Sequence, residues 1–157
     1  MLKSSGLKCA AMFLGTVAFG TFGEVASASP GRGVTPETFV TADLLEDAAI
    51  NHDQIKFQTK DPTVIRVQKL TFAPGAFTGW HHHPGTVVVA VQSGSVTLVD
   101  GNCATKTYGP GMPDGSVFIE GQDHAHEARS TSGATVYVTY VAPSPVFRIE
   151  DPAQSCP

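Results

Sequence analysis

The chain has 157 residues, with 10 Lys and Arg against 14 Asp and Glu, which gives a formal net charge of −4 at pH 7. This acidic balance offers no basic surface for nucleic acid, so a nucleic-acid-binding function is not expected. Hydrophobic residues make up 41% of the chain, which is enough to build the core of one ordinary domain.

Residues 1–28 have the pattern of a Sec-type signal peptide. Lys3 and Lys8 give a positively charged start, an apolar stretch follows, and Ala26-Ser27-Ala28 supplies a small-residue cleavage site. The apolar stretch is short for a membrane span and is interrupted by glycine and threonine. We therefore expect cleavage after Ala28, a periplasmic or secreted protein, and no membrane anchor.

Residues 29–50 are expected to form a leader and an arm ahead of the main domain. The segment from Ser29 to Thr35 is rich in Ser, Pro, Gly and Arg, which is typical of a flexible leader. Between Pro36 and Ile50 the apolar residues fit a short helix or a strand followed by a loop, and their periodicity does not decide between the two.

Residues 51–157 carry a succession of β-signals, ending in a C-terminal tail. Short runs of alternating or β-branched residues, separated by Gly and Pro turns, predict strands at Ile55–Thr59, Val64–Phe72, Thr86–Val91, Ser95–Val99, Val117–Ile119, His124–Arg129 and Thr135–Val141. The run Thr86–Val91 is apolar on both faces, as in a strand that is buried inside the fold or covered by a second subunit of a homodimer. Many short strands without a long helix predict an all-β barrel or sandwich.

Cys103 and Cys156 are the two cysteines that remain after the predicted cleavage. In an exported protein an even pair is typical of a disulfide, which here would tie the C-terminal tail to a central loop.

The histidines have a spacing that suggests a metal site. His81, His82 and His83 are consecutive, within a segment that reads as a strand, so His81 and His83 share one face and His82 points the other way. His124 and His126 repeat the two-residue spacing on a second predicted strand. Imidazole is the commonest protein ligand for transition metals, and two such pairs inside a barrel need a partner for their nitrogens. The alternative is that both pairs lie on exposed strand edges.

Two motifs resemble those of the cupin superfamily. The first reads Gly75-x5-His81-x-His83-x3-Val87-x6-Gly94, which matches the cupin pattern in every spacing but has valine at the position of the usual glutamate. The second reads Gly115-x5-Gly121-x-Asp123-x2-His126-x3-Ser130, which keeps the spacing, the first glycine and the histidine. The resemblance covers about residues 64–141 and implies a single cupin barrel, the double-stranded β-helix or jelly roll.

The resemblance also implies that His81, His83 and His126 are metal ligands, while Val87 removes the usual acidic ligand. Three histidines alone would leave the charge of the ion uncompensated, open to water or an anionic substrate. Alternatively His124 moves in as a fourth ligand or a neighbouring partner, and it is also the best candidate for a catalytic base. Glu120 and Glu127 are expected to point away from the face of His126.

The metal and the reaction are less determined than the ligands. Three imidazoles suit Zn or Fe(II) best, with Cu, Ni and Mn as further candidates. The resemblance allows a metal-dependent oxidoreductase, such as a dioxygenase, that acts on an anionic small molecule. The second hypothesis is a non-catalytic small-ligand-binding module that forms homodimers. In either case we expect a pocket lined by Trp80, Phe77, Val87, Val89 and Phe118.

Overall fold

The structure is a computed structural model that describes residues 29–121 and 123–156, and the predicted signal peptide lies outside this range. The described residues form twelve strands joined by turns and loops. Their bounds are β1 Arg32–Leu44, β2 Ala49–His52, β3 Ile55–Gln58, β4 Thr63–Phe77, β5 His81–His82, β6 Thr86–Gly94, β7 Val96–Asp100, β8 Thr105–Tyr108, β9 Val117–Glu120, β10 His126–Ser130, β11 Ala134–Ala142 and β12 Ile149–Glu150. Within the described part of the chain, nothing forms a helix of the length and hydropathy needed to cross a membrane.

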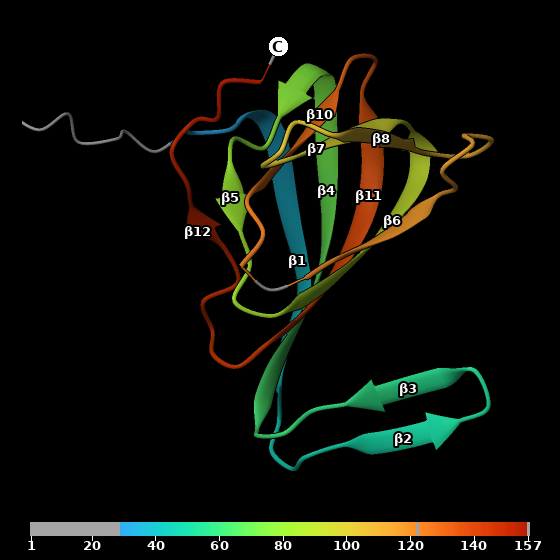
Figure 1. The fold of residues 1–157 in the computed structure, drawn as a ribbon, viewed down its shortest axis with the longest axis vertical. Coiled ribbons are helices and arrows are strands. Elements are labelled where there is room, and N and C mark those ends of the chain that lie inside the picture. Colours follow the sequence, from blue (N-terminus) through green and yellow to red (C-terminus); the bar gives the residue numbers. More distant parts are fainter. Residues whose placement is uncertain (1–28, 122, 157) are drawn as a thin grey trace, which may run out of the picture.

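Ten of the strands form one antiparallel sheet that curls into a barrel (Figure 1). Its main path runs β12-β5-β10-β4-β11-β6-β9, while β1 pairs with β4, and β7 pairs with both β10 and β8. This arrangement confirms the all-β fold class. The two strands that carry the histidines, β5 and β10, are neighbours in the sheet although about 45 residues separate them in the chain.

The N-terminal segment belongs to the barrel, contrary to the expectation of a leader ahead of it. Strand β1 begins at Arg32 and pairs with β4 along nearly its whole length. Among the described strands β1 pairs with β4 alone, so one side of its backbone makes no strand pairing, and an edge strand of this kind tolerates Pro36, which has no N–H. Local composition does not reveal this strand because its order comes from the long partner strand.

The core is built by strands that bury every second residue. On β6 the side chains of Val87, Val89 and Val91 are buried, whereas Val88 is 37% exposed. Of the two explanations offered for this apolar strand, burial of both faces inside the single chain is therefore contradicted, and cover by a second subunit is untested. Val88 lies opposite the exposed Ile119 of β9 on the outer surface, and the homodimer stays a prediction.

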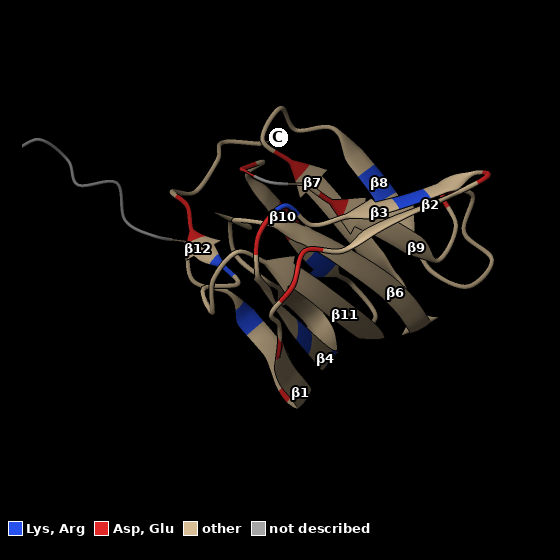
Figure 2. Cartoon of the chain, turned by 90° about the horizontal axis from the view of Figure 1, so that it is seen from below, with Lys and Arg blue, Asp and Glu red and all other residues tan. Residues whose placement is uncertain are grey.

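A separate hairpin, β2–β3, projects from one end of the barrel (Figure 1). All its residues are exposed, including Ile50 and Phe57, which lie opposite each other. Its base is closed by Thr59, whose N–H donates to the Ala48 carbonyl and whose hydroxyl accepts from the Ala48 N–H, both at 2.8 Å. Lys and Arg residues are spread over several strands, among them β8, in the view of Figure 2.

The C-terminal segment returns along the barrel and is fixed by a disulfide. Cys103 and Cys156 are bonded, which confirms the predicted pair. Between them, β12 pairs with β5 and so lies beside the histidine strand. The Asp151 N–H also donates to the Trp80 carbonyl at 2.9 Å.

Candidate metal centre

Three histidines converge inside the barrel. His81 and His83 come from β5 and the residue after it, and His126 is the first residue of β10, directly opposite His81. Their side chains are almost fully buried, and one ring nitrogen from each lies within 4.8 Å of the other two. His82 points to the other side of the strand, where its Nδ1 lies 2.9 Å from the Asp151 carboxylate. The structure thus separates the consecutive histidines as strand alternation requires.

Each of the three imidazoles is oriented by a main-chain carbonyl. In every case Nδ1 lies within hydrogen-bonding distance of such an oxygen: 2.9 Å for His81 to Gly79, 2.6 Å for His83 to Phe147 and 2.7 Å for His126 to His124. A carbonyl only accepts, so the proton must be on Nδ1. Nε2 of the neutral ring then carries a free lone pair, which is the form that binds a metal.

Gly79 shows how the local sequence supports this orientation. Its φ is +72°, a conformation that L side chains rarely adopt, and an added Cβ would collide with the backbone of Ser29. The turn directs the Gly79 carbonyl toward His81 Nδ1, two residues later. The glycine therefore fixes the first of the three rings.

Glu120, the last residue of β9, also enters the site. Its Oε2 lies 3.1 Å from His83 Nε2 and its Oε1 lies 3.1 Å from His126 Nε2, with the side chain nearly buried. The expectation that Glu120 points away from His126 is wrong. That expectation assumed that Glu120 and His126 alternate along one strand, but Glu120 ends β9 and His126 begins β10, with a loop between them. Glu127 does point elsewhere, because its carboxylate pairs with Arg129.

The buried charges influence one another strongly. Burial lowers the pKa of His81 to about 3, with help from the positive charge of Arg148, so this ring is neutral. Burial alone would raise the pKa of Glu120, but His126 and His83 outweigh it and lower that pKa to about 2. Burial likewise disfavours a charged His126, yet Glu120 raises its pKa above the ordinary value. Glu120 is therefore a carboxylate at all physiological pH values.

The described donor set fits a transition metal. His126 Nε2 is buried and has no hydrogen-bond partner, although the carboxylate is 3.1 Å away. A buried nitrogen without a partner is costly, and coordination of an ion would satisfy it. Three imidazole nitrogens and one carboxylate are the ligand types that zinc, iron and manganese accept.

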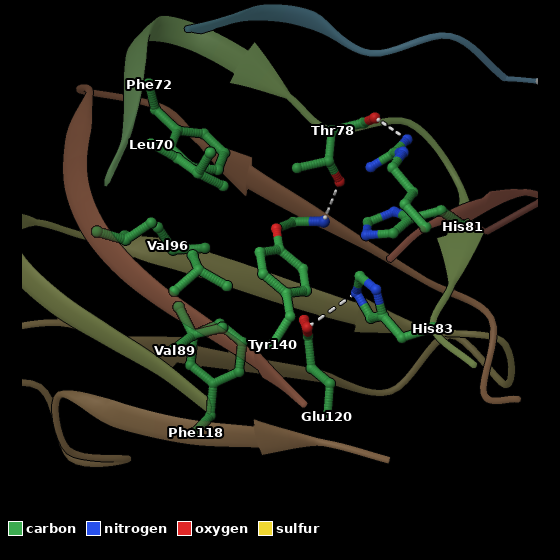
Figure 3. A pocket seen from close by; sticks show the side chains of 14 residues that line it. Leu70, Phe72, Thr78, His81, His83, Val89, Val96, Phe118, Glu120 and Tyr140 are labelled. Atoms are coloured by element: carbon green, nitrogen blue, oxygen red, sulfur yellow. Dashed lines mark hydrogen bonds and ion pairs between the residues drawn. The ribbon is translucent and has the colours of Figure 1, made fainter. Parts of the chain in front are cut away.

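His81, His83 and Glu120 lie at one end of an interior cavity of about 50 Å³. Figure 3 shows apolar side chains at the other end, with Tyr140 between the two groups. The apolar residues are Leu70, Phe72, Val89, Val96, Phe118, Ala128, Val136 and Val138. The small volume and this apolar wall favour small ligands beside the cluster.

The predicted pocket residues divide into three groups. Val89 and Phe118 line the cavity, and Phe77 lines a larger outer pocket. Trp80 and Val87 are buried but line none of the pockets described here. Val87 shares the inward face of β6 with Val89 but packs into the core rather than against the cavity.

His124 lies outside the buried cluster. Strand β10 begins only at His126, so the alternation that predicted a shared face does not extend to His124. Its side chain is exposed beside a surface groove, and it touches the site through its carbonyl oxygen. A catalytic role for its imidazole stays a prediction.

The fold can be compared with those of known proteins. The barrel superimposes on a cupin-2 domain from Rhodospirillum rubrum with a TM-score of 0.52 and 12% identity, covering 81% of this chain and 70% of that one. The polyketide cyclase RemF from Streptomyces resistomycificus gives a TM-score of 0.52 and 16% identity, covering 80% of this chain and 76% of that one. The fold is that of the cupin superfamily.

Sequence comparison adds one curated relative. It is (R)-mandelonitrile lyase from Granulicella tundricola, 34% identical over 79 residues. The match spans 50% of this chain and 59% of that protein. No family model matches the chain.

Proposed function

We propose that this cupin holds one divalent transition metal ion, Zn or Fe(II) first, through His81, His83 and His126, and that it acts on a small anionic molecule. The observation that carries the proposal is the set of three buried, converging imidazoles, each of which donates from Nδ1 to a carbonyl and so has an Nε2 without a proton in its neutral form. A bound ion would supply Lewis acidity or a site for oxygen. Export to an oxidising compartment, also proposed, is supported by the Cys103–Cys156 disulfide.

The preference for an anion is supported by arginines at the entrance. An outer pocket of about 410 Å³ is lined by Arg32, Arg66 and Arg148, with Glu150 as its acidic residue. Because Glu120 lies against the histidines, an ion there would not keep its full charge, contrary to the expectation for a three-histidine site. The attraction for an anion is therefore assigned to the arginines rather than to the metal.

The outer pocket and the interior cavity share part of their walls. Leu70, Thr78, Tyr140 and Arg148 line both. Arg148 is held between them by its Nη2, which donates to the Thr78 carbonyl at 2.6 Å and to Glu150 at 2.9 Å. A ligand with an acidic group in the outer pocket would then extend its other end toward the histidines.

Tyr140 is placed to donate a hydrogen bond to such a ligand. Its ring lies edge-on to His83, with ring centroids 5.7 Å apart. Burial raises the pKa of the Tyr140 hydroxyl to about 12, with a further contribution from Glu120. The hydroxyl therefore keeps its proton at physiological pH and acts as a donor.

Two reactions are the first to test. The curated relative is a mandelonitrile lyase, so we propose cleavage of small hydroxynitriles that carry an acidic group, which the arginines would bind, as the leading candidate. Oxygen-dependent cleavage by a dioxygenase, which the motif resemblance allows, is the second. The first is followed as aldehyde release, and the second as oxygen uptake after anaerobic loading with iron. If the metal-loaded protein releases aldehyde and takes up oxygen no faster than the metal-free protein, both reactions are refuted and a non-catalytic binding module is the remaining proposal.

The metal proposal has a direct test with a matched pair of variants. Protein purified without a histidine tag is analysed for metal as isolated and after incubation with Zn(II) or Fe(II). We expect about one equivalent of metal in the wild type and in H82A, and a loss of at least tenfold in H83A. His82 is the appropriate control because it is adjacent in sequence and faces away from the cluster. Equal loss in both variants, or less than about a tenth of an equivalent in the loaded wild type, would overturn the proposal.

A further inference from the structure

We propose that Glu120 is the acidic metal ligand of this cupin and that it replaces, from the neighbouring strand, the glutamate that Val87 displaces. The inference rests on the proposed metal site and specifies its fourth ligand. In the first motif the acidic position belongs to β6, whereas Glu120 is on β9. The carboxylate would thus come from β9 instead of β6, and the ligands would still be three histidines and one glutamate.

The strand register makes this exchange possible. Val87 and Glu120 are direct cross-strand partners in the β6–β9 pair. Side chains of such partners lie on the same face, with Cβ atoms about 5 Å apart. A carboxylate from either position therefore reaches the same region of the barrel. Val87 itself is 1% exposed and packs into the core, so its methyl groups fill the position from which a glutamate would have extended.

The distances from Glu120 to two of the three histidines suit donors that share one ion, whereas Glu120 is not in the group whose donor atoms all lie within 4.8 Å of one another. Two donors that bind the same ion through bonds of about 2.1 Å, at angles between 90° and tetrahedral, lie about 3.0–3.4 Å apart. Both contacts between Glu120 oxygens and imidazole Nε2 atoms measure 3.1 Å. His126 Nε2 nevertheless lacks a hydrogen-bond partner. A direct hydrogen bond to the carboxylate therefore does not account for the short distance between them. Convergence on a common ion explains both observations.

A glutamate that only balanced the charge of a bound ion would not need each of its oxygens to face a different histidine. The side chain is nearly buried and each of its oxygens faces a different histidine. Glu127, by contrast, is equally buried beside His126 in the chain but turns to Arg129. The two glutamates therefore give a matched comparison, one facing the histidines and one facing away from them.

The test moves the carboxylate back to its usual strand. Affinity for Zn(II) is measured by calorimetric titration, and the Co(II) absorption spectrum reports the ligands directly, for the wild type, E120Q, E120V, the double variant V87E/E120V and the control E127Q. Circular dichroism establishes that each variant is folded. We expect E120Q and E120V to lose at least tenfold in affinity and to change the Co(II) spectrum. The double variant should recover most of the affinity, and E127Q should resemble the wild type.

Two results would overturn the inference without touching the proposed function. One is an E120Q protein with wild-type affinity and an unchanged Co(II) spectrum, while H83A still loses the metal. The other is a folded double variant that binds Zn(II) no better than E120V. If wild type and all variants fail to bind, the metal site itself is refuted, which is a different outcome.

Discussion

Removing the disulfide should destabilise the barrel while leaving the histidine cluster in place. The bond joins Cys103, in the turn between β7 and β8, to Cys156 near the end of the chain, 53 residues later. It closes the segment that carries the five strands β8 to β12. We therefore consider the double substitution C103S/C156S, which breaks the bond without leaving a single reactive thiol.

The expected loss follows from the length of the closed loop. Cross-linking residues this far apart removes chain entropy from the unfolded state worth about 4 kcal/mol at 25 °C. For a domain of this size, each kcal/mol corresponds to about 3–5 °C in Tm, so the expected decrease in Tm is about 15 °C. The metal centre should change little, because the Phe147 carbonyl that orients His83 lies nine residues before Cys156 and the Phe147 side chain is itself buried.

The assay is urea unfolding of the wild type and the double variant, followed by circular dichroism, with Zn(II) titration of both. Thiol titration of the native wild type gives the control, since a formed disulfide leaves no free sulfhydryl among Cys103 and Cys156. A difference in the free energy of unfolding below about 1 kcal/mol would refute the loop-entropy reasoning. A loss of Zn(II) affinity in the folded double variant would refute the claim that the cluster is held independently of the tail.

Two further outcomes test the core and the outer pocket. V136A should lower the free energy of unfolding by about 2–3 kcal/mol in the same urea assay, because Val136 is fully buried. The control V117A, at an exposed position of β9, should change the free energy of unfolding by less than about 0.5 kcal/mol. Equal effects of the two substitutions would contradict the assignment of the core. R66Q should weaken binding of benzoate, used as a simple carboxylate probe, by about 10–100-fold at low salt, because Arg66 lines the outer pocket. R129Q, whose side chain pairs with Glu127 outside that pocket, should bind benzoate as the wild type does, and an equal loss would remove the anion site.

The sequence was informative wherever a signal lies along one strand. Alternation placed His81 and His83 on one face and His82 on the other, and the structure has the same arrangement. The β-signals predicted an all-β fold, and the pair Cys103 and Cys156 predicted the disulfide that is present. These features depend on the pleat of a strand or on the count of cysteines, and both are local properties of the chain.

Tertiary structure decided everything that depends on how strands are paired. The first strand, Arg32–Leu44, is ordered by its partner β4 and carries no clear signal of its own. His124 was expected inside the barrel on the assumption that its strand began earlier than it does. In both cases the deciding interactions come from residues that are distant in sequence.

Glu120 is the clearest example. From the sequence, Val87 meant a site without its acidic ligand and with an uncompensated charge. The register of β6 and β9 places Glu120 directly opposite Val87 and brings its carboxylate to His83 and His126. Alternation along a strand predicts which residues share a face. Only the hydrogen-bonded register between strands decides which faces meet, and this register depends on the packing of the whole barrel.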